Sequence, residues 1–239
     1  MKEKKDLILI ACAMKREAQL LINKLDQPRK ILENGFIFFE GEIYNKNVII
    51  GISGPGLINM SAMISIANLK WCICAIINYG MVGAYGNNIH KKDIIIGKKC
   101  MNINSYITGK IEKGIDINLW EFVTFLDGKE DNLIVYNADK TLLDNCKKMK
   151  YTNSDVIFGI IGSGDVWNRE FEKIILLNDK YKINCEDMES VAIYQLSNRF
   201  NIPCISIKGV SNNEILNESY DDSVLENLLD YVTMYIKEL

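Results

Sequence analysis

Two glutamates stand where a predicted buried strand gives way to a predicted helix, and they are the first candidates for chemistry. Glu17 follows the strand Leu7–Ala13, and Glu189 follows the strand Lys182–Cys185. A carboxylate at such a point can accept hydrogen bonds from the hydroxyl groups of a ligand. It can equally cap the helix and interact favourably with the helix dipole. From the residues alone, the cap is the better explanation for Glu17, and the two explanations are balanced for Glu189.

Three further segments place glycines and polar residues at the ends of predicted strands. They are Asn78–Gly83, Ser163–Trp167 and Lys208–Asn212. In open α/β sheets, ligands bind where strands end and loops begin. We therefore expect these segments to surround one ligand site, together with Ala13–Glu17 and Glu186–Ser190.

The elements that position these segments follow from the hydrophobic pattern, in which short apolar runs alternate with longer amphipathic stretches. The predicted strands are Leu7–Ala13, Phe36–Tyr44, Val48–Ile52, Cys74–Asn78, Asp93–Lys98, Val156–Ile161, Lys182–Cys185 and Cys204–Val210. The predicted helices are Lys15–Leu25, Leu57–Leu69, Thr141–Lys148, Met188–Phe200 and Asp222–Lys237. This alternation predicts a mostly parallel sheet with helices packed on its faces. The region Asn102–Leu133 fits neither pattern and is a candidate excursion at a subunit interface.

The charge balance limits the classes of partner. The chain has 239 residues, with 28 Lys and Arg against 31 Asp and Glu, so its formal charge is −3. Proteins that bind nucleic acid normally carry a basic stripe, which this balance disfavours. The run Leu7–Ala13 follows basic residues and so begins like an export signal, but it is short and Lys15 and Arg16 follow directly. We interpret it as a buried strand, and no other apolar run approaches membrane-spanning length.

The cysteines indicate a reducing environment. There are 7 cysteines, an odd number, and only one histidine, His90. The sequence contains no Cys-x-x-Cys pair, so a zinc site has too few plausible ligands. Most of the cysteines lie in apolar, strand-like stretches: Cys12, Cys72, Cys74, Cys185 and Cys204. We expect buried, reduced thiols in a cytoplasmic protein that binds no metal.

In their order and spacing, the five segments resemble the nucleoside phosphorylase superfamily, and most closely its methylthioadenosine/S-adenosylhomocysteine nucleosidases. The joint pattern is specific: a strand followed by Ala13-Met14-x-x-Glu17, then Ser163-Gly164-Asp165, then Met188-Glu189-Ser190. The likeness runs from about Leu7 to the C-terminus and is weakest between Asn102 and Asn153. It implies one three-layer α/β/α domain over residues 1–239, with a central mixed, mostly parallel sheet. It also implies a homodimer, a purine nucleoside as substrate and no cofactor.

The resemblance gives the two glutamates roles in cleaving an N-glycosidic bond. Glu17 matches the carboxylate that orients and activates water. The phosphorylases begin instead with a phosphate loop bearing glycine and arginine, which this sequence lacks, so hydrolysis is favoured over phosphorolysis. Glu189 matches the residue that accepts hydrogen bonds from two ribose hydroxyls, and Met188 matches the residue that packs on the sugar. A nearby negative charge also stabilises the oxocarbenium-like transition state.

Other matches suggest how the base is bound. Trp167 matches the aromatic residue that stacks on the purine, and the backbone of Asn168 would contact the edge of the base. Gly80 and Gly83 match a turn that lets the backbone approach the ligand. Met81, like Tyr79, departs from the small polar residues usual there.

Three more residues complete the expected substrate-binding set: Asp187, Lys208 and Ser211. Lys208 replaces a usual arginine near Glu17, which keeps the charge but loses the planar guanidinium fork.

The largest departure from the family is Asn212. The nucleosidases have an aspartate there, which donates a proton to purine N7, whereas an amide cannot release a proton at neutral pH. General acid catalysis contributes about 10²–10⁴-fold, so the replacement matters. Three alternatives follow: weak activity on adenine nucleosides, a 6-oxopurine nucleoside (futalosine- or inosine-type) hydrolase or phosphorylase, or a catalytically weak nucleoside-binding protein. Asp165 could replace the missing acid, although its family position indicates a structural role.

Overall fold

The fold is built on one ten-stranded mixed sheet. This computed structural model describes residues 5–108, 120–122, 124–126, 129–131 and 135–239. The strand order is β11-β6-β12-β13-β5-β1-β4-β3-β2, and β14 pairs with β5 and β6. The strands of the sheet are β1 Asp6–Cys12, β2 Asp26–Glu33, β3 Phe36–Ile43, β4 Lys46–Ile52, β5 Cys72–Ala84, β6 Ile94–Asn102, β11 Val135–Asn137, β12 Val156–Ser163, β13 Cys185–Asp187 and β14 Cys204–Asn213.

Parallel pairing forms the middle of this sheet. Strand β1 runs parallel to β4 and β5, and β14 runs parallel to β5. Strand β12 is likewise parallel to β6 and β13, whereas the β2–β3–β4 edge is antiparallel. The parallel strands β1, β5 and β14 therefore end at one edge, where Glu17, Gly83 and Asn212 lie.

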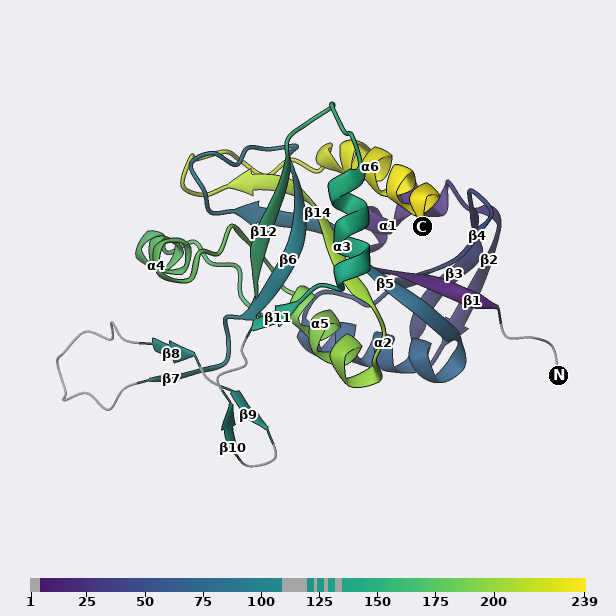
Figure 1. The fold of residues 1–239 in the computed structure, drawn as a ribbon, viewed down its shortest axis with the longest axis horizontal. Coiled ribbons are helices and arrows are strands. Elements are labelled where there is room, and N and C mark those ends of the chain that lie inside the picture. The colour runs from purple at the N-terminus through teal and green to yellow at the C-terminus, as the bar shows by residue number, and fades with distance from the viewer. Residues whose placement is uncertain (1–4, 109–119, 123, 127–128, 132–134) are drawn as a thin grey trace.

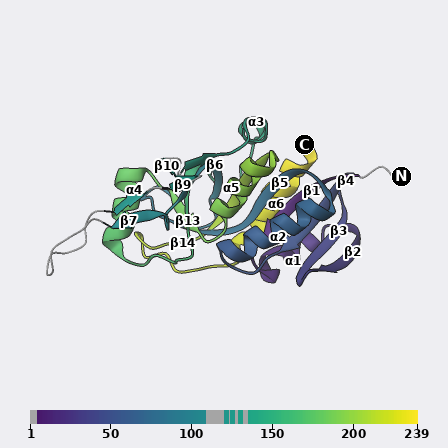
Figure 2. The same cartoon turned by 90° about the horizontal axis from the view of Figure 1, so that it is seen from below.

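Helices cover both faces of the sheet and confirm the predicted three layers. Helices α2 Leu57–Lys70 and α5 Ser190–Phe200 lie on one side, and α6 Val224–Glu238 lies on the other (Figures 1 and 2). Helices α1 Lys15–Ile22 and α3 Lys140–Lys148 share the core of α6. The two faces carry separate apolar cores, one centred on α2 and α5 and one on α1 and α6. Helix α4 Phe171–Tyr181 packs in a third, smaller cluster.

Local sequence explains the main elements. Strand β1 is buried from Leu7 to Cys12 because helices cover both of its faces. Helix α6 buries Leu225, Leu228, Val232 and Ile236, whose spacing of three and four residues forms one apolar stripe.

Several predicted boundaries were wrong. The strand predicted at Lys182–Cys185 begins only at Cys185, because Lys182 ends α4 with a left-handed φ of 57°. Strands β2 and β11 and helix α4 were not predicted. Of the cysteines expected to be buried, Cys72 and Cys74 are exposed.

Within Asn102–Leu133, short described strands form two small antiparallel sheets beside the main one. Strand β7 Tyr106–Thr108 pairs with β8 Trp120–Phe122, and β9 Thr124–Leu126 pairs with β10 Lys129–Asp131. Figure 1 shows both outside the body of the main sheet. Residues 109–119, 123, 127–128 and 132–133 of this predicted excursion lie outside the described residues. Within the described part of the chain, no helix is long and apolar enough to span a membrane.

Candidate active site

A cavity of about 240 Å³ lies at the edge where β1, β5, β13 and β14 end. Nine of the eleven predicted site residues line it: Glu17, Met81, Gly83, Trp167, Asp187, Met188, Glu189, Ser211 and Asn212. The other two, Asn168 and Lys208, are buried behind its wall. The fold therefore brings the five sequence segments to one place.

Glu17 is held in the cavity wall by backbone amides. It is 3% exposed, and its Oε2 accepts a hydrogen bond from the Met14 N–H at 2.9 Å. Its Oε1 accepts one from the Met81 N–H at 3.2 Å. A Cβ atom on Gly80 would lie 2.9 Å from Oε1, so glycine at this position makes room for the carboxylate rather than for a ligand. Burial raises the pKa of Glu17, against the opposing charge of Lys208 and the amide donors.

Glu189 is anchored across the cavity by the start of helix α2. Its Oε1 accepts a hydrogen bond from the Gly56 N–H at 2.9 Å. Asp165 Oδ1 accepts one from the neighbouring Leu57 N–H at 2.8 Å, so Asp165 caps α2. Gly56 has a φ of 100°, and a Cβ atom there would lie 2.9 Å from Asp165 Oδ1. The glycine therefore lets the carboxylates approach the positive end of the helix.

Lys208 and Asp187 form a buried ion pair behind this wall. The Lys208 Nζ lies 2.9 Å from Asp187 Oδ2, and both side chains are 2% exposed. The same carboxylate accepts hydrogen bonds from the Ser190 hydroxyl at 2.6 Å and from the Ser190 N–H at 3.0 Å. The sequence led us to expect direct substrate contact from both residues. Instead, protein donors occupy both Asp187 oxygens, and Lys208 does not reach the cavity.

The positive charge of Lys208 acts on three carboxylates. Burial would lower the pKa of Lys208, but the charges of Asp187, Glu189 and Glu17 outweigh it and raise that pKa. Burial also opposes ionisation of Asp187, yet Lys208 and Ser190 hold its pKa below the ordinary value. Burial and the charge of Asp187 raise the pKa of Glu189 to about 7. At neutral pH and above, the wall carries excess negative charge that favours a positively charged ligand or transition state.

Aromatic residues line the mouth of the cavity. Trp167 is 57% exposed, and its ring centroid lies 6.5 Å from that of Tyr220. The Arg16 guanidinium lies 5.4 Å from the Tyr220 ring centroid. The Tyr220 hydroxyl lies 3.6 Å from the Met81 sulfur. Stacking of a base on Trp167 stays a prediction. Arg16 and Tyr220 were not among the predicted site residues, although both line the cavity.

Asn168 binds Glu186 through its backbone N–H and its side chain. Its N–H donates to Glu186 Oε1 at 2.7 Å, and its side-chain Nδ2 donates to Glu186 Oε2. The expected contact of the Asn168 backbone with a base stays a prediction, with its N–H directed at Glu186. Glu186 itself lines the cavity and was missed by the sequence analysis. The buried Tyr85 hydroxyl lies near the same carboxylate but makes no hydrogen bond of good geometry.

Asn212 lies at the end of β14, beside Gly83. Its Oδ1 accepts a hydrogen bond from the Ser211 hydroxyl at 2.9 Å, and its Nδ2 donates to Glu214 Oε1 at 3.3 Å. A Cβ atom on Gly83 would lie 3.4 Å from both amide atoms, in van der Waals contact. The amide therefore occupies the cavity wall over Gly83.

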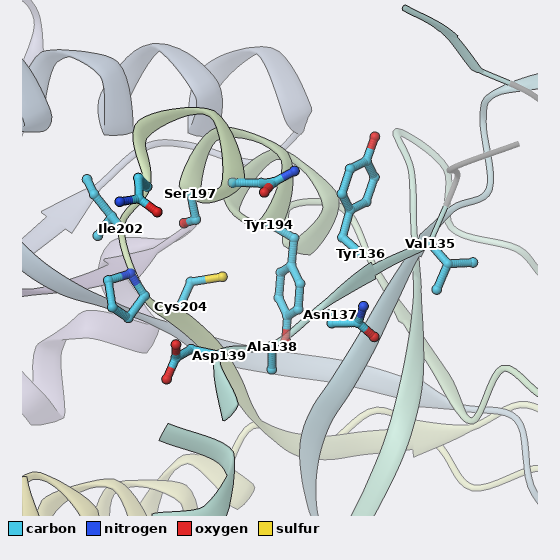
Figure 3. Close-up of a pocket in the computed structure, with 12 residues that line it drawn as sticks. Val135, Tyr136, Asn137, Ala138, Asp139, Tyr194, Ser197, Ile202 and Cys204 are labelled. Atoms are coloured by element: carbon cyan, nitrogen blue, oxygen red, sulfur yellow. The ribbon is translucent and has the colours of Figure 1, made fainter. Parts of the chain in front are cut away.

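A second cavity, of about 420 Å³, lies at the opposite end of β14 and contains none of the predicted residues. Figure 3 shows Tyr194, Ser197 and Cys204 around it. Among the described residues that line it, Asp139 alone carries a carboxylate, which caps helix α3 through the Leu142 N–H. It therefore lacks the free acid groups of the first cavity. The described residues contain no group of three or more His, Cys, Asp or Glu placed to bind a metal.

Comparison with known proteins gives consistent matches. The family model described as Phosphorylase superfamily matches residues 7–233. The 5'-methylthioadenosine/S-adenosylhomocysteine nucleosidase of Buchnera aphidicola subsp. Baizongia pistaciae is 28% identical over 226 residues, which are 92% of this chain and 83% of that protein. The corresponding nucleosidase of Neisseria meningitidis, solved with methylthio-immucillin-A, has a TM-score of 0.81 at 21% identity, covering 98% of this chain and 100% of that one. Futalosine hydrolase of Helicobacter pylori strain 26695 has a TM-score of 0.80 at 17% identity, covering 98% of each chain.

The structural likeness confirms the predicted nucleoside phosphorylase-like fold with its mixed sheet. The family match includes all five segments that converge on the cavity. The chain belongs to the phosphorylase superfamily.

Proposed function

We propose that this protein is a purine nucleoside N-ribohydrolase of the methylthioadenosine/S-adenosylhomocysteine nucleosidase type. One observation carries the proposal: Glu17 and Glu189 are buried in one cavity, and each is oriented by an amide from a different element. The nucleosidase relatives, at 28% identity, support the same activity. A protein that only bound nucleosides would have no need of a buried carboxylate to activate water.

In the proposed reaction, Glu17 accepts a proton from water while the water oxygen bonds to C1′ of the ribose. The C1′–N9 bond breaks, and its electron pair leaves with the base. Ionised Glu189 accepts hydrogen bonds from the ribose hydroxyls and stabilises the positive charge that develops on the sugar. The departing base gains one proton, for which solvent is the source, because Asn212 can donate a hydrogen bond but not a proton. The products are the free base and a reducing sugar.

The test is a panel of nucleosides incubated with and without phosphate, with the products separated by chromatography. The panel contains methylthioadenosine, S-adenosylhomocysteine, adenosine and inosine. We expect free base and unphosphorylated sugar at rates that do not depend on phosphate. Cleavage that requires phosphate and yields a sugar 1-phosphate would show a phosphorylase instead. Saturable binding without any cleavage would show a binding protein.

We also propose that the whole chain is one domain, that it works in the cytoplasm and that it forms a homodimer. The dimer is supported by an apolar stripe on α2, where Ile58 and Leu69 are 81% and 83% exposed. Ala62 lies between them on the same helix face. Leu69→Glu should shift the protein from dimer to monomer in analytical ultracentrifugation. Leu32→Glu is the matched control, because Leu32 is also largely exposed but lies on the edge strand β2. A monomeric wild type, or equal behaviour of both variants, would contradict this interface.

A further inference from the structure

The turn that follows β14 carries Tyr220 to the mouth of the cavity. Asn213 and Glu218 close this turn by exchanging two backbone hydrogen bonds, at 3.2 and 2.9 Å. Just beyond it, the Asp221 N–H donates to the carbonyl oxygen of Ser211 at 2.9 Å. Tyr220 lies between these two attachments, so the position of its ring depends on both.

A buried side chain fixes the start of this turn. Asn213 is fully buried, and its Nδ2 donates to the carbonyl oxygens of Gly86 and Ile89 at 2.8 and 2.7 Å. Its Oδ1 accepts a hydrogen bond from the Ile215 N–H at 3.0 Å. These contacts join uncharged groups, so they do not change with pH.

The end of the turn is held by an ionisable contact. Glu218 Oε1 lies 3.0 Å from His90 Nδ1, and Glu218 Oε2 accepts a hydrogen bond from the Lys91 N–H at 2.9 Å. His90 is the only histidine of the sequence, and its side chain is 59% exposed. Histidine is the side chain that changes charge near neutral pH. The attachment of Glu218 therefore has a charged and an uncharged form.

The charged form is present at acidic and neutral pH. The hydrogen bond to Glu218 raises the pKa of His90, desolvation opposes this, and the charges of Glu218, Asp93 and Asp155 add to the rise. Burial opposes ionisation of Glu218, but the hydrogen bonds from His90 and from the Lys91 N–H hold its pKa below the ordinary value. The ion pair is thus complete below the ordinary histidine pKa of about 6.5 and is lost as pH rises through the raised value.

We propose, on the basis of the hydrolase function proposed above, that Glu218 is a positioning residue for the mouth of the active site. Paired with protonated His90, it holds Tyr220 at the cavity. There the Tyr220 hydroxyl lies 3.6 Å from the Met81 sulfur, and its ring lies beside that of Trp167. Loss of the His90 charge loosens the turn and weakens substrate binding, while the carboxylates that perform the reaction stay in place.

The test compares variants of His90 at about pH 6 and about pH 8.5, with methylthioadenosine as substrate. His90→Gln is uncharged at both pH values, and His90→Lys is charged at both. At the lower pH, His90→Gln should raise KM roughly two- to fivefold over wild type, the range for an exposed ion pair, and His90→Lys should match wild type. At the higher pH, His90→Gln should match wild type, and His90→Lys should lower KM by the same factor. Each ratio is taken at one pH, so the titration of Glu189 cancels.

Two further variants test whether the effect passes through Glu218 and Tyr220. Glu218→Gln and Tyr220→Ala should each abolish the difference in KM between His90→Gln and His90→Lys. The control is Asp144→Asn, which breaks the exposed ion pair with Lys147 on α3 and should leave KM unchanged. In all His90 variants, kcat should change less than KM.

Hydrogen exchange tests the attachment without substrate. The amides of Glu218 and Asp221 both donate backbone hydrogen bonds, and their exchange reports opening of the turn. After correction for the intrinsic rate at each pH, their protection should fall roughly two- to fivefold from about pH 6 to about pH 8.5 in wild type. The protection should stay constant in His90→Lys.

The outcomes separate this inference from the hydrolase proposal. Cleavage with KM ratios near one at both pH values would overturn the positioning role and leave the hydrolase standing. The expected exchange pattern without any cleavage would overturn the hydrolase and leave the pH-dependent attachment of Glu218 standing. Equal protection of wild type and His90→Lys at the higher pH would overturn the inference whatever the activity. If a variant fails to fold by circular dichroism, wild-type protection that does not change with pH would overturn it alone.

Discussion

Removing the charge of Lys208 tests whether the buried ion pair holds the carboxylates of the site. Lys208→Met keeps a long unbranched side chain and leaves Asp187, which is 2% exposed and 2.9 Å from Nζ, without its cation. Loss of one partner of a buried pair costs about 3–5 kcal/mol, because the other charge stays buried and unpaired. For a chain of this size, 1 kcal/mol corresponds to about 2–4 °C. We therefore expect Tm to fall by roughly 6–20 °C.

The pH dependence of this loss has a definite sign. In the wild type, the pKa of Asp187 is lowered, so the ionised group contributes stability above its unfolded pKa and loses it as pH falls through the folded value. Without Lys208, burial raises that pKa instead. The ionised group then costs stability as pH rises above about 4. The difference between wild type and variant should widen from pH 4 to pH 7.

The assay is urea unfolding followed by tryptophan fluorescence between pH 4.5 and pH 7.5. The double variant Lys208→Met with Asp187→Asn is the control, because it removes both charges together. It should recover at least half of the lost unfolding free energy. A loss below about 1 kcal/mol, in the range of an exposed pair, would refute the reasoning. So would a loss that is equal at every pH.

Three further predictions concern the reaction. Glu17→Gln should lower kcat about 10²–10⁴-fold with base affinity unchanged by calorimetry, and near-normal turnover would leave Glu17 as a helix cap only. Because the pKa of Glu189 is about 7, wild-type kcat/KM should rise with pH through that value as the carboxylate ionises. Glu189→Gln should lose both that rise and most of the activity, and an unchanged pH profile would assign the titration to another group. Asn212→Asp should raise methylthioadenosine cleavage at least tenfold, because Glu214 lies beside the new carboxyl and favours its protonated form. The same change should impair 6-oxopurine nucleosides, and movement of both substrates in one direction would contradict the role given to this position.

The buried elements could be predicted from the sequence because their apolar patterns are strong. Strand β1 and helix α6 carry continuous or regularly spaced apolar residues, and both were found. Strand β2 Asp26–Glu33 is an exposed edge strand with no apolar alternation, so its pairing with β3 decides its conformation. Helix α4 did carry a signal, since Ile174 and Leu177 are buried three residues apart.

The sequence predicted which segments form the site, but it predicted less well where their side chains point. Glu17 and Asn212 line the cavity because each lies where a strand ends. The direction of the Lys208 side chain, toward the cavity or toward Asp187, depends on tertiary packing and cannot be predicted from the local sequence pattern. Glu186 could have been found, because it lies in the same segment at the end of a strand as Asp187, Met188 and Glu189.

The residues of the site are held in place in two different ways. Glu17 and Glu189 are oriented by the backbone N–H groups of Met14, Met81 and Gly56. The N–H groups at positions 14 and 81 remain whatever side chain stands there, whereas position 56 requires the backbone conformation of glycine. Glu186 and Asn212 contribute to the cavity wall through their side chains instead. Substitutions at those two positions would alter the hydrogen-bonding groups of the cavity wall without displacing Glu17 and Glu189. Duplicated genes with this architecture can therefore diverge in substrate while remaining enzymes throughout.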